Sequence, residues 1–188
     1  MMQQFGAFIT ESSGHLSEYL PFYRKRKDLI DKYCGVGYNG GTSFYADNWP
    51  KWRQDGDMWR TEFANGEHQD WEVKRSWEYC SYVIEAIEMN RPFVMYSTVP
   101  NTGLISNLPQ DGVVEVACHC DKNGVVPTYY GALPPQMAAI CDWNMRCYEL
   151  AAQACIDFDL EKAIYAMMLD PNTASACSPE EIRKMAKE

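Results

Sequence analysis

The stretch from residue 10 to 19, TESSGHLSEY, combines a histidine, a tyrosine, two glutamates and three serines. Such side chains accept and donate protons, which is the chemistry of general acid–base catalysis. The serine pair is typical of a helix N-cap, and a helix continuing through Tyr23 would place His15 and Tyr19 on one face. The stretch is therefore a candidate proton-transfer site, the alternative being that His15 is a structural residue near a helix start.

A second candidate is the loop NTGLISNLP, which runs from Asn101 to Pro109. It is rich in side chains that form hydrogen bonds, and it carries no charge. Asn offers a donor and an acceptor to each hydroxyl of a sugar, so Asn101 and Asn107 suit a polyhydroxylated ligand. The alternative is that both asparagines only build turns.

Cys118, His119 and Cys120 are three potential zinc ligands in a row. In a strand, however, the two cysteines would point to one face and His119 to the other. No C-x-x-C or H-x-x-x-H pair elsewhere completes a set of four ligands. A zinc protein is therefore an alternative that the spacing does not favour. The glycine-rich stretch 35–41, GVGYNGG, lacks the spacing of a phosphate loop and predicts a turn.

The candidate loop is flanked by two β-branched and aromatic runs, Phe93–Val99 and Val113–Cys118, which predict buried strands. Val125–Tyr130 predicts a third strand after a tight turn. With helices beginning near Glu72 and Gln136, these strands predict an α+β fold: a mixed, mainly antiparallel sheet packed with helices.

Apolar residues at spacings of three and four predict a helix over 72–90, which would carry Glu78 and Tyr79. Further helices are predicted over 136–158, opened by a proline pair, and over 160–169. The order Ser-Pro-Glu-Glu from Ser178 predicts a capped helix start.

The segment 42–70 and its border hold four tryptophans, at positions 49, 52, 59 and 71, interleaved with Asp, Asn and Gly. We find no sustained periodicity among them. The segment is predicted to be a lid, or a contact with a second copy of the chain in a homo-oligomer; the alternative is that its rings pack under a loop.

The 188 residues carry a formal net charge of −9, which argues against nucleic acid and anionic membrane as partners. No run of eighteen apolar residues occurs, and the first residues lack the pattern of a signal peptide. The eight cysteines are irregularly spaced, which favours free thiols. These features predict a cytoplasmic protein that binds a small molecule or another protein.

Three ordered segments carry a resemblance to a known family. FGAFITESSGHLSEYLPFYRK, the long segment from SWEYCSYV through VVEVACHC to PPQMAA, and AMMLDPNTAS resemble the C-terminal half of family 4 glycoside hydrolases, closest to the α-galactosidase and α-glucosidase branch. The resemblance implies the C-terminal, lactate/malate dehydrogenase-like fold of these enzymes over a single domain, residues 1–188.

The resemblance also implies an NAD-dependent mechanism. In that family NAD+ takes a hydride from C3 of the sugar, and a divalent metal, usually Mn2+, polarises the resulting ketone. A protein base then removes the C2 proton, the aglycone is eliminated, water adds and the hydride returns. The implied substrate is an α-glycoside.

By the resemblance, His15 stands where the phospho-sugar branch has its tyrosine base, and an imidazole is a competent base at physiological pH. Tyr19 is the alternative base. The implied catalytic group is His15, Tyr19, Ser12 and Glu11. Asn101 and Asn107 match the family's N-x-G-x-I-x-N loop, and Glu78 and Tyr79 match its E-Y-A-S helix, so all four are implied substrate contacts.

The sequence also departs from the family pattern. The phospho-sugar branch has a phosphate-binding arginine about twenty residues past its base, whereas residues 33–36 here are YCGV, which favours an unphosphorylated sugar. Pro100 replaces the arginine of many α-galactosidases, which leaves galactoside, glucoside and galacturonide open.

The family's NAD-binding domain and the Cys and His that hold its metal lie upstream of the residues matched here. The chain is therefore expected to be the substrate-side, oligomer-forming half, with the NAD-binding domain as a partner. Alone it is expected neither to bind NAD or Mn2+ tightly nor to turn over. The alternative is an inactive module that binds sugar or assembles subunits.

Overall fold

The computed structural model describes residues 1–8, 13–34, 44–67, 72 and 74–188. The chain divides into two compact units, one made of Met1–Thr10 with Trp77–Glu188 and one of Glu11–Ser76. The predicted single domain over 1–188 thus contains two units. The 35–41 turn lies outside the described residues.

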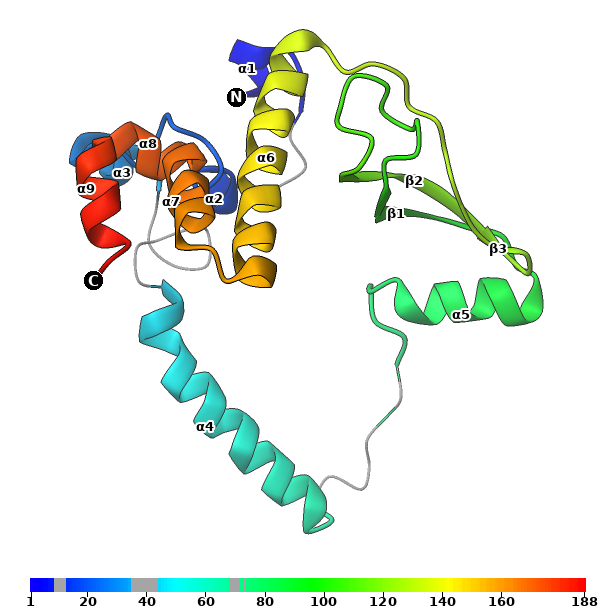
Figure 1. The fold of residues 1–188 in the computed structure, drawn as a ribbon. Helices are drawn as coiled ribbons and strands as arrows, with labels where there is room; N and C mark the ends of the chain where they lie inside the picture. The colour runs from blue at the N-terminus through cyan, green and yellow to red at the C-terminus, as the bar shows by residue number, and fades with distance from the viewer. Residues whose placement is uncertain (9–12, 35–43, 68–71, 73) are drawn as a thin grey trace. The chain divides into compact units, whose positions relative to one another are not determined.

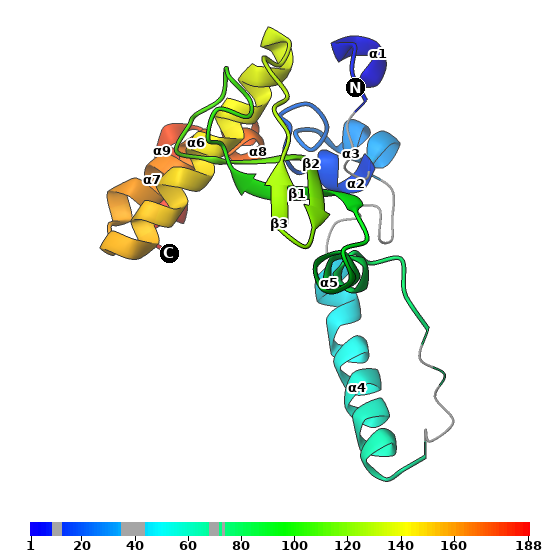
Figure 2. The same ribbon diagram turned by 90° about the vertical axis from the view of Figure 1, so that its right-hand side faces the viewer.

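The larger unit is built around a three-stranded sheet of β1 (Phe93–Pro100), β2 (Val113–Asp121) and β3 (Gly124–Pro127), in the order β1-β2-β3 (Figures 1 and 2). Both pairings are antiparallel, and the one parallel pairing among the described residues is an isolated bridge between Ile105 and Gly131. The α+β prediction is confirmed. Within the described chain the sheet itself is antiparallel rather than mixed.

The third strand is shorter than predicted, because the chain leaves the sheet after Pro127. The N–H of Thr128 still donates to Ala117 O at 2.9 Å, but the N–H groups of Tyr130 and Gly131 donate to Leu104 O at 2.9 and 3.1 Å. The backbone therefore turns from β2 towards the 101–109 loop. Local β propensity could not show this change of partner.

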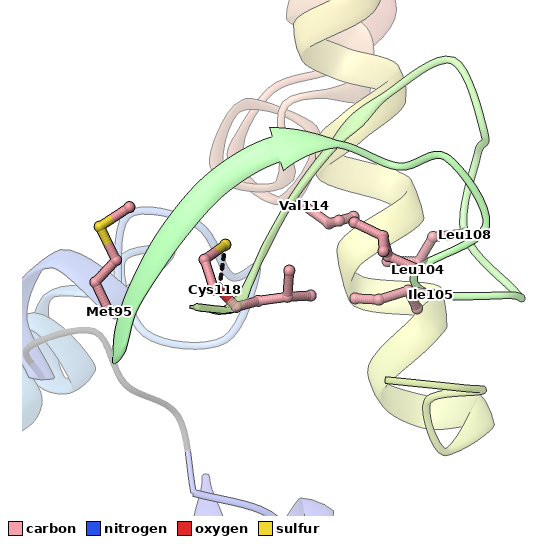
Figure 3. Close-up of a cluster of buried hydrophobic side chains, with 7 residues drawn as sticks. Met95, Leu104, Ile105, Leu108, Val114 and Cys118 are labelled. Atoms are coloured by element: carbon pink, nitrogen blue, oxygen red, sulfur yellow. Dashed lines mark hydrogen bonds between the residues drawn. The ribbon is translucent and has the colours of Figure 1, made fainter. Parts of the chain in front are cut away.

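One face of the sheet forms the core. Along β2 the buried residues alternate with more exposed ones, so that Val114, Val116, Cys118 and Cys120 point inward. The β1–β2 loop adds Leu104, Ile105 and Leu108 to the cluster shown in Figure 3. Each apolar side chain of this size stabilises the fold by roughly 1.5–3 kcal/mol when fully buried. The loop is therefore part of the core.

The larger unit contains six described helices: α1 (Met2–Phe5), α5 (Cys80–Met89), α6 (Pro135–Asp157), α7 (Leu160–Leu169), α8 (Pro171–Ala176) and α9 (Pro179–Met185). Both α5 and α6 contribute partly buried side chains to the sheet core, including Val83, Ala138 and Met145. The predicted cover of the sheet by two helices is thus confirmed.

α6 and α7 form a helical hairpin, visible as the yellow and orange helices of Figure 1. Phe158 ends α6 in the left-handed region, with φ 54°, and Asp159 caps α7 by accepting from the N–H groups of Glu161 and Lys162. At Ser178 the predicted cap is a full capping box with Glu181. The predictions for residues 136–158, 160–169 and 178 onwards are confirmed.

The helix predicted over 72–90 is wrong at its beginning. α5 starts at Cys80, so Glu78 lies before it and Tyr79 is its N-cap residue. The apolar pattern included Trp77, which is 85% exposed and has no buried face to hold a helix. The predicted end is correct, since Asn90 stops the helix in the left-handed region.

The smaller unit contains α2 (Ser13–Leu16), α3 (Lys27–Tyr33) and α4 (Phe44–Ala64) in its described residues. The helix predicted to continue through Tyr23 ends at Leu16 instead. Pro21 has no N–H to donate to the carbonyl of residue 17, which opposes a helix there. A second correction concerns 42–70, where we expected no regular pattern and the structure has the 21-residue helix α4.

No helix in the described ranges combines the length and apolar character that a bilayer crossing requires.

Candidate substrate site and family membership

Asn101 is fully buried and organises the predicted sugar loop from inside. Its Nδ2 donates to the carbonyl oxygens of Ile105 and Pro109, each at 3.0 Å, and more weakly to Leu108 O at 3.3 Å. Its Oδ1 accepts from the N–H of Ile105 at 2.8 Å. Because these bonds occupy the amide and the residue has no exposed surface, Asn101 can influence a ligand only by shaping the loop.

Asn107 fastens the same loop to the segment before α6. Its Nδ2 donates to Leu133 O at 2.8 Å, and its Oδ1 accepts from Leu133 N–H at 2.9 Å. Unlike Asn101 it is exposed, and it borders a hollow of about 350 Å³ that Asp142 and Arg146 of α6 also line. The turn-building alternative describes both asparagines. A sugar contact by Asn107 stays a prediction.

Glu78 and Tyr79 are exposed at the start of α5, in the same unit as the asparagine loop. The Tyr79 carbonyl accepts from the N–H groups of Tyr82 and Val83 at 3.0 Å each, which begins the helix. The Tyr79 ring meets the Phe93 ring edge to face at 6.0 Å. The backbone of Tyr79 is therefore anchored while part of its side chain stays accessible. Substrate contacts by Glu78 and Tyr79 stay predictions.

His15 and Tyr19 lie in the smaller unit, at the end of α2 and in the turn after it. The backbone tightens there, since Glu18 N–H donates to His15 O at 2.8 Å and Tyr19 N–H to Leu16 O at 3.2 Å. His15 is half-buried and Tyr19 is 40% exposed. The two are thus not on one helical face as predicted, although each retains accessible surface. Ser12 and Glu11 lie outside the described residues.

Arg24 closes the turn that carries these residues, and sequence reasoning missed it. Its Nε donates to the hydroxyl of buried Ser17 at 2.9 Å, and its Nη2 lies 3.5 Å from Glu18 Oε1. A basic run such as the one from Arg24 to Lys27 predicts a solvated face. The Arg24 side chain is only 18% exposed, so the guanidinium holds the backbone just after His15. The signal in the sequence was the pair Ser17 and Glu18, which stands shortly before Arg24 with a proline between them.

Tyr23 makes a ring contact within the smaller unit. It meets Tyr33 edge to face at 5.3 Å. Burial, and secondarily the Tyr33 hydroxyl, raise the pKa of Tyr23 above its usual value. Tyr23 therefore stays protonated near neutral pH, which makes it a hydrogen-bond donor rather than a base.

The structure separates the three potential zinc ligands. Cys118 and Cys120 are buried, with exposed fractions of 0% and 1%, whereas His119 is exposed on the opposite face of β2. The predicted alternation is confirmed, and these three side chains cannot share one ion. Among the described residues, no group of three or more His, Cys, Asp or Glu side chains could hold a metal. The described residues therefore do not fit a manganese site by themselves.

A pocket of about 450 Å³ lies between the end of the β1–β2 loop and α6. Its lining residues are Pro109, Asp111, Gly112, Val113, Met145, Arg146, Tyr148 and Glu149. No predicted site residue is among them. The surface of the pocket is mostly apolar, and its polar lining residues are Asp111, Arg146, Tyr148 and Glu149.

Comparison with known proteins identifies the family. Residues 1–173 match the model of the family 4 glycosyl hydrolase C-terminal domain. The chain is 36% identical over 189 residues to the α-galactosidase of Bacillus subtilis (strain 168), covering 98% of this chain and 42% of that protein. It is 32% identical over 193 residues to the α-galactosidase of Rhizobium meliloti (strain 1021), covering 100% of this chain and 39% of that protein. The chain thus spans about two fifths of the length of these relatives.

Solved structures share the fold. The lplD glucosidase of Bacillus subtilis superposes with a TM-score of 0.77 at 23% identity, over 99% of this chain and 40% of that one. A 6-phospho-α-glucosidase from gut microorganisms, solved in complex with NAD and Mn2+, superposes with a TM-score of 0.53 at 24% identity. The match covers 68% of this chain and 28% of that one. The family match and the α-galactosidase identities show that the chain belongs to family 4 glycosyl hydrolases, as their C-terminal domain.

Proposed function

We propose that the chain is the substrate-side part of an NAD- and Mn2+-dependent α-glycosidase that acts on unphosphorylated α-galactosides. The observation that carries the proposal is the 36% identity over 98% of the chain to a protein named α-galactosidase. A relative named α-galacturonidase also matches the full length of the chain, but at 22% identity. The higher identity to the α-galactosidase favours galactose over galacturonic acid, and the absence of charge in the loop from 101 to 109 agrees with a neutral sugar.

In this proposal His15 is the base that accepts the C2 proton of the sugar, and Tyr19 is the alternative base. Two observations support the assignment: each side chain keeps accessible surface, and Arg24 fixes the turn between them through Ser17 and Glu18. A base must be held within hydrogen-bond reach of the proton it removes, so a fixed turn serves the reaction. Glu11 and Ser12 are proposed neighbours of the base.

The proposed sugar contacts are Asn107, Glu78 and Tyr79, with Asn101 holding the loop. Asn107 is accessible beside Asp142 and Arg146, which could exchange hydrogen bonds with sugar hydroxyls. When bound in the complete enzyme, NAD and Mn2+ supply reversible oxidation at C3 and polarisation of the ketone. The part proposed for this chain is to bind the sugar and to move the C2 proton.

The test uses the complete enzyme, assembled with its NAD-binding domain, and melibiose as substrate. His15→Ala is expected to lower kcat by roughly 100-fold or more, because general-base catalysis contributes about 10²–10⁴-fold. Tyr19→Phe is expected to lower it less. His119→Ala is the matched control, since this histidine lies exposed on β2 and has no proposed role.

A second readout identifies the step. Product formed in D2O carries deuterium at C2 if that proton exchanges with solvent. The rate of deuterium incorporation should fall in parallel with kcat in the His15 variant. Full activity in both His15→Ala and Tyr19→Phe would remove the proposed base. Activity confined to glucosides or galacturonides would contradict the substrate assignment while leaving the base intact.

A further inference from the structure

Two hollows of the larger unit join along α6. The first is the hollow of about 350 Å³ beside Asn107, and the second is the pocket of about 450 Å³ at the end of the β1–β2 loop. Pro109 and Arg146 line both of them, so the hollows meet at these two residues. In each hollow the chain around the loop forms one side and α6 forms the other. Together they make one continuous depression, which we call the α6 cleft.

The α6 cleft follows the loop and the helix in the same order. The first hollow is lined by residues from 107–109 and from 138–146. The second is lined by residues from 109–113 and from 145–149. Residues 138–149 of a helix span about 16 Å at the usual rise. Both volumes lie within the range of roughly 300–1,000 Å³ that ligand pockets occupy. The cleft therefore has room for a ligand made of two parts.

The first hollow offers hydrogen-bonding groups to a sugar. Asn107 uses one N–H and one lone pair on Leu133, and a side-chain amide has a second of each. The Asp142 carboxylate lies 3.5 Å from Arg146 Nε, and its oxygens have further lone pairs. The amide can donate to one sugar hydroxyl while the carboxylate accepts from another. This end of the cleft suits a hydroxylated group.

Arg146 is held between two carboxylates. Its Nη1 donates to Glu149 Oε2 at 2.8 Å, and its Nε lies 3.5 Å from Asp142 Oδ1. A carboxylate or phosphate on a sugar would have to displace one of these acids and approach the other, which like-charge repulsion opposes. The first hollow therefore favours a neutral sugar.

The second hollow has a mostly apolar surface. Its apolar lining consists of Pro109, Gly112, Val113 and Met145. A Cβ on Gly112 would overlap Met145 Cε, so the methionine reaches across to Gly112 because that residue has no side chain. A methionine side chain is flexible and polarisable, which lets it fit apolar groups of different shape. This end of the cleft suits an apolar group.

We infer that the α6 cleft binds an α-galactoside through both of its parts. The sugar lies against Asn107 and Asp142, and an apolar aglycone lies between Val113 and Met145. The inference rests on the proposed galactosidase function and names the aglycone that it favours: an alkyl or aryl group rather than a second sugar. Hydroxyl groups of a second sugar would lose water at the apolar lining without gaining partners there.

Methyl and butyl α-galactoside test the apolar end in the complete enzyme, assembled with its NAD-binding domain. The two substrates share the sugar and have similar leaving groups, so they differ by three methylene groups. A fully buried methylene is worth about fourfold in affinity, so KM for butyl galactoside should lie roughly tenfold or more below KM for methyl galactoside.

Val113→Asn should reduce this difference to about threefold or less, because it places an amide at the apolar end. Val126→Asn is the control for that variant. This valine is equally exposed, at 58% against 59%, but it lies on β3 and lines neither hollow. Far-UV circular dichroism checks that both variants keep their fold.

Asp142→Ala tests the sugar end. It should raise KM for both galactosides about tenfold and leave their ratio unchanged, since the carboxylate is placed against the sugar that they share. Asp157→Ala is its control, because this aspartate also lies on α6, has the same exposed fraction of 49% and pairs with a cation, Lys162. It should change neither KM by more than about twofold.

The outcomes separate the inference from the proposed function. Turnover of methyl galactoside with no lower KM for butyl galactoside would overturn the inference and leave the proposed function intact. Equal effects of Val113→Asn and Val126→Asn on the ratio would do the same, as would unchanged KM values in Asp142→Ala. An enzyme that turns over neither galactoside would contradict the proposed function, and the inference with it.

Discussion

Asn101 and Ile105 are joined by two hydrogen bonds, one in each direction. The Asn101 Nδ2 donates to Ile105 O at 3.0 Å, and the Ile105 N–H donates to Asn101 Oδ1 at 2.8 Å. The side-chain amide thus supplies backbone partners inside the loop, in addition to the bridge between Ile105 and Gly131. This allows the apolar residues of the loop to enter the core without leaving their backbone groups unsatisfied.

We predict that Asn101→Ala destabilises the chain by about 2–4 kcal/mol, because it leaves the buried Ile105 N–H without its acceptor and removes the donor that ties together the carbonyls of Ile105, Leu108 and Pro109. Asn107→Ala should cost about 1 kcal/mol, since water can replace its exposed bonds to Leu133. Urea unfolding followed by circular dichroism measures both, with Asn123→Ala in the exposed β2–β3 turn as the control. Equal losses of unfolding free energy in Asn101→Ala and Asn107→Ala would contradict the greater structural role of the buried Asn101.

Arg24 is predicted to position the turn that follows His15. In the complete enzyme, Arg24→Ala should lower kcat about tenfold, because a misplaced base loses much of its effect. Arg26→Ala is the control, as that arginine is exposed and pairs only locally with Asp28 at 2.9 Å. Arg24→Lys keeps the charge but not both bonds, so it should rescue activity only in part. An Arg24→Ala enzyme with normal kcat would show that the turn needs no such support.

The eight cysteines are all thiols, and their reactivity should follow burial. Burial raises the pKa of Cys141, and burial together with Asp170 raises the pKa of Cys147, so less thiolate is present at pH 8. A thiol reagent such as DTNB should modify exposed Cys80 and Cys155 first. It should reach Cys147 and the other buried thiols only after denaturation. Rapid labelling of Cys147 in the native chain would contradict its placement between α6 and α7.

The capping box of α9 should make its stability depend on pH. Hydrogen bonds from the backbone and hydroxyl of Ser178 lower the pKa of Glu181 below its usual 4.5. A depressed carboxyl pKa stabilises the folded state above about 4.5, and this contribution is lost as the pH falls through the lower folded value. Glu181→Gln should therefore differ from the parent at pH 7 and approach it near pH 3. Amide hydrogen exchange of α9, measured for both proteins at pH 7 and near pH 3, checks whether the stabilisation is lost at the lower pH.

Much of the fold could be predicted because local signals agreed with the final packing. The strands at 93 and 113 begin and end where β-branched runs meet Pro, Gly and Asn, and α6, α7 and α9 begin at prolines and capping residues. The failures occurred where a local pattern had no tertiary counterpart. Trp77 belongs to the apolar repeat before Cys80 but is exposed, so no packing stabilises a helix there and α5 begins at Cys80.

α4 shows the opposite error. Considering only tryptophans, with Pro50 and Gly56 between them, hid a repeat that Tyr45 and Phe63 complete. Residues of different type can occupy one helical face, and periodicity has to be counted over all of them. The sequence contained the repeat, but only the helix showed which residues share one face.

The sequence by itself determined the family, the α+β class, the opposite faces of Cys118 and His119, and the residues on which the chemistry was predicted. These follow from residue order and from the fixed alternation of a strand. Only the tertiary structure decided that the Asn101 amide faces the backbone and that Arg24 holds the turn after His15. Both depend on which distant groups are brought within 3 Å of a side chain, and residue order does not specify that distance.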